Sequence, residues 1–78
     1  MQVNFSTNNA STAFEYLTKA LPSMNLTKES TKPILDLVEA GKIRIGDPFM
    51  YGGKAPVYPE PSCTQEDQQA VMDWLHNL

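Results

Sequence analysis

Hydrophobic and polar positions recur at helical spacing in three segments of the chain, and residues 12–20 form the first of them. Thr12 and Glu15 stand three residues apart, the spacing of a capping box in which hydroxyl and carboxylate bond to backbone amides. Pro22 stops the segment, because proline lacks an amide proton and its ring clashes with the preceding turn. The pattern predicts a first helix over residues 12–20.

The preceding residues follow a different pattern. Residues 2–6 alternate at strand spacing and place Val3 and Phe5 on one side. This predicts a short half-buried strand, with a frayed terminus as the alternative. Residues 6–11 are rich in Asn, Ser and Thr and predict a loop. We therefore expect a short strand or a loop in residues 1–11.

A second helix is predicted to begin at Pro33, after a connection at residues 23–32. Proline is tolerated at the first helical position, where its missing amide proton is not needed. The apolar residues on one side of this helix are Ile34, Leu37 and Val38, with Leu35 beside them. We expect Asp36 and Glu39 to point to water, and Gly41 to end the helix in a left-handed conformation.

Strand spacing resumes after this glycine. Residues 42–45 alternate, which predicts a strand with Ile43 and Ile45 inward and Lys42 and Arg44 outward.

A glycine pair at residues 52–53 separates two further runs, residues 49–51 and 54–58. A two-residue Gly-Gly loop favours a tight hairpin, because both positions can adopt positive φ. Pro56 cannot donate to a ladder of hydrogen bonds, so its strand is expected at a sheet edge.

The third helical segment covers residues 65–76 and has the clearest start signals. Ser62 or Thr64 can cap it, and Glu66 and Asp67 place negative charge where the helix dipole favours it. Its apolar side consists of Ala70, Val71, Trp74, Leu75 and Leu78. We interpret this side as core, with a homodimer contact through Trp74 and Leu78 as the alternative.

Together these elements predict an α+β fold with three helices and a small antiparallel sheet. At 78 residues the chain is expected to form one domain. Its parts would be residues 1–11, a central part at residues 12–58 and a C-terminal amphipathic helix at residues 62–78.

The central part resembles a known family. The resemblance lies in the segment Ile34-x-x-Leu37-Val38-Glu39-Ala40-Gly41-Lys42-Ile43-Arg44, followed by the Gly-Gly turn and Val57-Tyr58. This segment is similar to the recognition helix and wing of winged helix-turn-helix regulators. The resemblance implies a helix in the major groove of DNA and a wing whose bases touch the phosphate backbone. It implies nucleic-acid contacts from Lys28, Lys32, Lys42 and Arg44, with Lys54 also in the wing.

Charge argues against that role. The chain has a net charge of −3 and a pI near 4.8, although residues 19–54 hold six basic and four acidic residues. Asp36 and Glu39 would repel phosphate, and Pro33 interrupts the helix that should read the bases. DNA binding is therefore the second hypothesis.

No catalytic constellation is recognisable, so we expect no enzyme and no cofactor. Cys63 and His76 are the single cysteine and histidine, too few for a structural zinc site. The glycines at residues 52–53 match neither a phosphate-binding loop nor a dinucleotide fingerprint.

The first hypothesis is a small regulatory protein that binds and modulates or inhibits a larger protein, as phage or mobile-element inhibitors do. Phe49, Met50 and Tyr51, with Lys54, form the predicted hairpin tip, and aromatic residues and methionine are enriched in interface cores. The alternative is that these side chains cover the domain's own core. The sequence shows neither a membrane-spanning run nor a signal peptide, so we expect a cytoplasmic protein without membrane contact.

Overall fold

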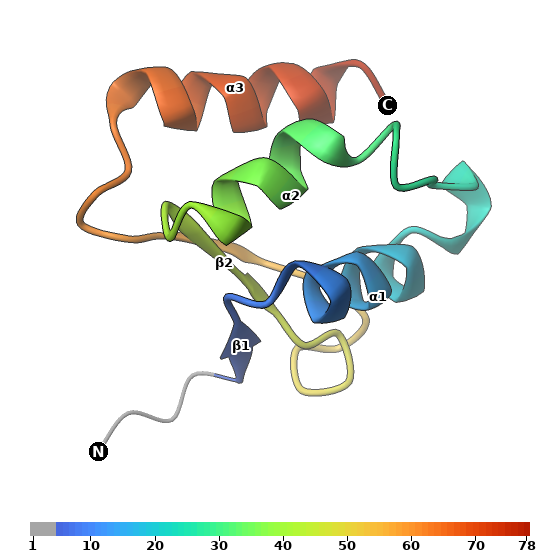
Figure 1. Ribbon diagram of the computed structural model, residues 1–78. Helices are drawn as coiled ribbons and strands as arrows, with labels where there is room; N and C mark the ends of the chain where they lie inside the picture. The colour runs from blue at the N-terminus through green and yellow to red at the C-terminus, as the bar shows by residue number, and fades with distance from the viewer. Residues whose placement is uncertain (1–4) are drawn as a thin grey trace.

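A computed structural model describes residues 5–78 and contains three α-helices and a three-stranded antiparallel sheet (Figure 1). The elements in chain order are β1 (Ser6–Thr7), α1 (Ala10–Ala20), the 3₁₀ helix η1 (Pro22–Met24), α2 (Lys32–Glu39), β2 (Ile43–Gly46), β3 (Val57–Pro59) and α3 (Gln65–His76). The predicted α+β class is confirmed.

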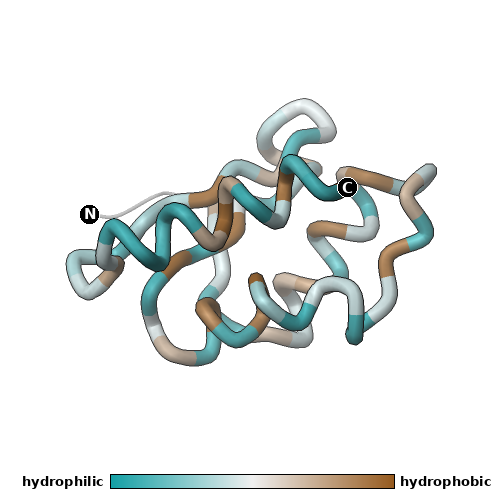
Figure 2. Tube along the Cα trace, turned by 90° about the horizontal axis from the view of Figure 1, so that it is seen from above, coloured by the Kyte–Doolittle hydropathy of each residue, from teal (hydrophilic) through white to brown (hydrophobic). Residues whose placement is uncertain are grey.

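The sheet has the order β1-β2-β3, so β2 is central and β3 is an edge strand. Ser6 pairs with Gly46 on one side of β2, and Val57 pairs with Ile45 on the other. Both α1 and α2 pack on β2, and α3 packs on α2, which lies between the other two helices (Figure 1). Hydrophobic and hydrophilic stretches alternate along the helices in Figure 2, as expected for helices that bury one side.

The core lies between the helices and the central strand. Its buried apolar side chains are Ala13, Leu17, Ile34, Val38, Ile43, Ile45 and Val71. The strand prediction for Ile43 and Ile45 is confirmed, since these side chains are 1% and 0% exposed. In α2, Ile34 and Val38 are buried while Asp36 is exposed, as expected.

The start of α1 differs from the prediction. The helix begins at Ala10 and is capped by Asn9, whose side-chain oxygen accepts from the Thr12 amide at 3.0 Å. The expected cap at Thr12 is wrong, because an Asn stands one turn earlier in extended backbone and satisfies that same amide. Glu15 is exposed on the helix surface.

The structure also corrects the N-terminal prediction. Residues 2–4 of the predicted strand lie outside the described residues, and Phe5 is 50% exposed. Ser6, the last residue of the predicted strand, does lie in a strand, but the loop predicted over residues 6–11 shrinks to residues 8–9, because Ser6 and Thr7 pair with β2 and α1 begins at Ala10. The backbone groups of Ser6 and Thr7 are satisfied by pairing with β2, and the polar composition of the segment does not reveal this long-range contact.

In α2, the helix begins one residue before Pro33, with Thr31 as N-cap. Gly41 has φ +75°, which confirms the predicted left-handed helix end. The third helix, α3, has the predicted bounds. Of the two predicted caps, Ser62 and Thr64, it is Thr64 that caps the helix, in a capping box with Asp67.

The tight hairpin is wrong. The strand after the glycine pair, β3, pairs with β2 instead of with residues 49–51, which form turns, and residues 47–56 join the two strands. Gly52 and Gly53 do adopt positive φ, at +67° and +88°. They serve a larger loop, because the Gly53 amide donates to the Pro48 carbonyl at 2.7 Å. The following strand lies at the sheet edge, as expected.

Candidate functional site

The β2–β3 loop, residues 47–56, carries the side chains predicted to contact a partner (yellow in Figure 1). Phe49 is 89% exposed, more than any other large apolar side chain among the described residues, and Met50 is 44% exposed. Lys54 is exposed, whereas Tyr51 is half-buried. The structure therefore brings the four predicted residues into one loop but gives Tyr51 an internal role.

A turn at the start of the loop fixes the position of Phe49. The Asp47 carboxylate accepts from the Phe49 amide at 3.0 Å, and the Asp47 carbonyl accepts from the Met50 amide at 2.9 Å. Asp at the first position and proline at the second are favoured in such turns, because the carboxylate bonds locally and proline presets φ. Pro48 is itself buried.

Contacts at the base tie the loop to the sheet. The Gly46 amide donates to the Pro56 carbonyl at 2.7 Å, and the Asp47 amide donates to the Phe5 carbonyl at 2.7 Å. The Tyr51 hydroxyl accepts from the Phe5 amide at 3.3 Å. These bonds join the loop to residues on both sides of β2, so the exposed tip is held by an ordered frame.

Tyr51 also stacks at an angle on Tyr58 of β3, with ring centroids 6.2 Å apart. A hydrogen bond with the Tyr51 side chain, together with burial, raises the pKa of Tyr58 above its usual value. The two tyrosines thus act as packing and hydrogen-bonding groups under the loop.

The four predicted nucleic-acid contacts fall into two pairs. Arg44 donates to the Ser6 hydroxyl and carbonyl at 2.8 and 2.9 Å, and Lys42 binds groups near the start of α3. Lys28 and Lys32 are exposed near the start of α2, but Lys32 pairs with Asp36 at 3.1 Å. The structure does not bring the four bases into one patch.

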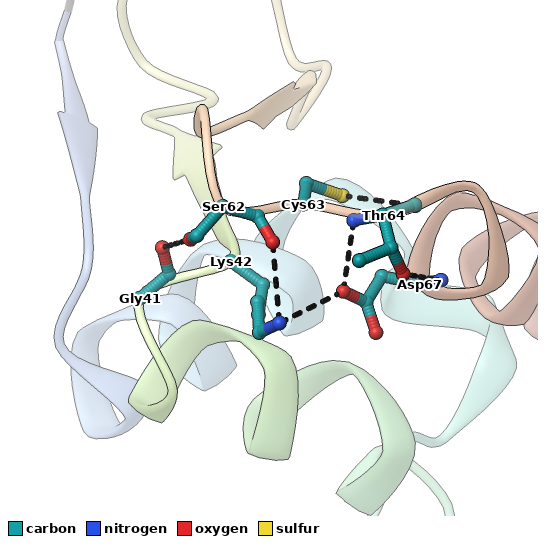
Figure 3. Close-up of polar contacts among 6 residues, drawn as sticks. All are labelled: Gly41, Lys42, Ser62, Cys63, Thr64 and Asp67. Carbon is teal, nitrogen blue, oxygen red and sulfur yellow. Dashed lines mark hydrogen bonds and ion pairs between the residues drawn. The ribbon is translucent and has the colours of Figure 1, made fainter.

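Lys42 belongs to a polar cluster that joins the α2–β2 turn to the start of α3 (Figure 3). Its Nζ lies 3.2 Å from Asp67 Oδ2 and donates to the Ser62 carbonyl at 3.2 Å. The Ser62 hydroxyl donates to the Gly41 carbonyl at 2.9 Å. The Thr64 amide bonds to the Asp67 carboxylate, and this bond, helped by Lys42, holds the pKa of Asp67 below its usual value.

Trp74 and Leu78, predicted as core with a homodimer contact as the alternative, have different surroundings. Trp74 packs against the core, and its Nε1 donates to the Ser30 carbonyl at 2.7 Å, which ties α3 to the segment before α2. Leu78 is 42% exposed. Met72 and Leu75 of the same helix are 48% and 44% exposed. The exposed apolar part of α3 is therefore Met72, Leu75 and Leu78, with Trp74 turned to the core.

Sequence reasoning missed two parts of this surface. The first is the set of hydrogen bonds that tie Asp47 and Tyr51 to Phe5; the Gly46-Asp47-Pro48 run predicts the turn itself but not these distant contacts. The second part is an apolar groove beside the loop that includes Ala20 and Ala55. It has no local signal, because its residues come from several elements.

Within residues 5–78, no group of three His, Cys, Asp or Glu side chains is placed to hold a metal ion. The helices of that part of the chain also lack the length and apolar character that a bilayer crossing needs. No family model, curated protein or solved structure gives a significant match to the chain. The geometry of the surface is thus the basis for assigning a function.

Proposed function

We propose that the protein is a small non-catalytic regulator that binds a larger protein and modulates or inhibits it through the β2–β3 loop. The observation that carries the proposal is Phe49, a phenylalanine 89% exposed on a loop whose backbone is hydrogen-bonded at its tip and base. The binding free energy becomes more favourable as a partner removes more apolar surface from water, so a highly exposed apolar side chain can contribute most. A phage or mobile-element inhibitor is one kind of protein that fits this description.

Order in the loop supports the proposal. Binding is weakened by the entropy lost when mobile segments become fixed, so a preformed loop binds at lower cost. The Asp47 turn and the bonds to Phe5 provide that order before any partner arrives. Met50, also exposed beside Phe49, is a flexible side chain that adapts to varied apolar surfaces.

Affinity capture from cells of the source organism tests the proposal. Phe49→Ala should weaken the affinity for the captured partner about 30-fold, and so reduce its recovery, since truncating an interface anchor costs about 2 kcal/mol. Met24→Ala is the matched control, because Met24 is 39% exposed on η1, away from the loop in sequence. Retention of every partner by a folded Phe49→Ala variant would refute the proposal. Tyr51→Ala is a poorer probe, because Tyr51 holds the loop to Phe5.

The alternative is a DNA-binding regulator of the winged-helix kind. Lys42 and Arg44 already bond within the chain, which leaves Lys28 and Lys32 as the exposed bases of the predicted set. Few phosphate contacts give weak binding. We expect mixed-sequence duplex DNA at low salt to bind no more tightly than in the high micromolar range. Nanomolar binding that falls steeply with salt would reverse the order of the two hypotheses.

Self-association through α3 would rest on Leu78, because Trp74 is engaged with Ser30.

A further inference from the structure

An apolar groove of about 190 Å³ opens between α1, α3 and the returning part of the β2–β3 loop. The side chains that line it include Leu17, Leu21, Val71, Trp74 and Leu75. Gly53, Lys54 and Ala55 line it from the loop. The same loop therefore exposes Phe49 and contributes part of a groove.

Lys54 gives this groove a charge preference. It is the one charged residue among those that line the groove, and it makes no ion pair with residues 5–78. Its side chain is exposed, so its ammonium group is available to an anion from solution. An apolar lining beside a single cation favours a ligand that is apolar with a carboxylate close by.

Two other grooves on the described part of the chain lack this combination. The groove between α1 and α2 is lined by Lys28 and Lys32 but also by Asp36 and Glu39, so its charges oppose one another. The groove between β3 and α3 is apolar and has no charged residue in its lining.

We propose that the groove beside Lys54 receives a large apolar side chain of the protein partner, and that Lys54 binds an acidic residue close to it in the partner's sequence. This inference rests on the proposed function, because the β2–β3 loop would contact the same partner. A cavity of about 150 Å³ holds a benzene ring, so a groove of this size takes one leucine or phenylalanine side chain.

The proposal defines a contact with two points. Phe49 inserts into the partner, while the partner inserts its own side chain beside Lys54. Opposite charge at the edge of the groove selects the acidic neighbour, since like charges placed together are strongly disfavoured.

Selection of short random peptides on the full chain tests the inference. Enriched peptides should carry Leu or Phe with Asp or Glu close in sequence, and their affinity is then measured by fluorescence anisotropy. Lys54→Glu should weaken binding about tenfold and Lys54→Met about threefold, because the pair is exposed to solvent. Ala20→Phe should abolish binding, since Ala20 lines the groove and a ring there fills it.

Lys28→Glu is the matched control for charge, because Lys28 is an exposed lysine away from this groove, and it should leave binding unchanged. Failure to enrich any peptide, enrichment without acidic residues, or equal binding by Lys54→Glu would overturn the inference. Lys54 is exposed, so its variants test the groove even if Ala20→Phe fails to fold.

Failure here is separable from failure of the proposed function. Suppose that Phe49→Ala loses the cellular partner but the Lys54 variants bind peptides as tightly as the wild type. The groove inference alone would then be refuted. Suppose instead that the Lys54 variants lose peptide affinity but Phe49→Ala still captures the cellular partner. The proposed role of the loop tip would then be refuted.

Discussion

Gly46 lies directly against Pro56, and a Cβ atom at Gly46 would stand 2.6 Å from Pro56 Cγ. The same Cβ atom would stand 3.2 Å from Tyr51 Cδ2. This close approach lets the Gly46 amide reach the Pro56 carbonyl and closes the base of the β2–β3 loop. The glycine at the end of β2 is thus a requirement of the loop that presents Phe49.

Gly46→Ala should lower the free energy of unfolding by about 1–3 kcal/mol, because the added methyl group clashes with a proline ring that has little freedom to move. Urea denaturation measures the change. Gly52→Ala is the comparison: its Cβ meets open space, and its cost of about 1 kcal/mol would come from positive φ instead. A Gly46→Ala variant as stable as the wild type would contradict the close approach.

Acidification should weaken the cluster at the start of α3. The pKa of Asp67 is lower in the folded protein than in the unfolded chain, so its contribution to stability is present above about pH 4 and is lost as the pH falls through the folded-state pKa. Asp67→Asn should therefore be less stable than the wild type at pH 7, and the difference should shrink at lower pH. Urea denaturation across that range measures it.

Glu66→Gln is the control for this titration, because Glu66 is an exposed acid in the same helical turn. A stability difference between wild type and Asp67→Asn that stays constant down to pH 2 would rule out the proposed linkage.

The N-cap of α1 gives a third prediction. Asn9→Ala should cost about 1 kcal/mol of stability, because the Thr12 amide loses its side-chain acceptor. Thr12→Ala should cost less, within about 0.5 kcal/mol, since its hydroxyl caps no backbone amide and makes only a 3.4 Å bond to the Asn9 side chain. Thermal unfolding of both variants measures the difference. If Thr12→Ala proves the more harmful, the helix starts where the sequence pattern alone places it.

Local sequence signals were sufficient where an element is defined by its own residues. The bounds of α3 follow from its cap, its acidic first turn and its apolar spacing, and Gly41 ends α2 as its type predicts. The alternation of Ile43 and Ile45 locates β2 because a half-buried strand has a period of two.

Local signals failed where distant residues decide the structure. Arg44 looked like an exposed wing base, but its guanidinium binds Ser6, 38 residues away in the chain. Trp74 packs against the core as predicted, but the bond from its indole to Ser30, 44 residues away, has no local signal. The cap of α1 was likewise misplaced: Thr12 was predicted, whereas Asn9, shortly after β1, caps the helix.

The candidate site was predicted in part for the same reason. Phe49 and Lys54 were identified from residue type and from the nearby glycine pair. The shape of the loop was not, because its base is closed by Phe5 and Pro56, which lie on opposite sides of β2. The groove beside Lys54 depends on α1 and α3 and has no signal in the loop sequence.

The central claim is that Phe49 contacts a protein partner, and site-specific photo-crosslinking in cells of the source organism tests it most directly. A photoreactive phenylalanine analogue in place of Phe49 should give a covalent adduct with one larger protein on irradiation. The same analogue in place of Met24, an exposed side chain on η1, should give none. An adduct from position 24 and none from position 49 would contradict the account.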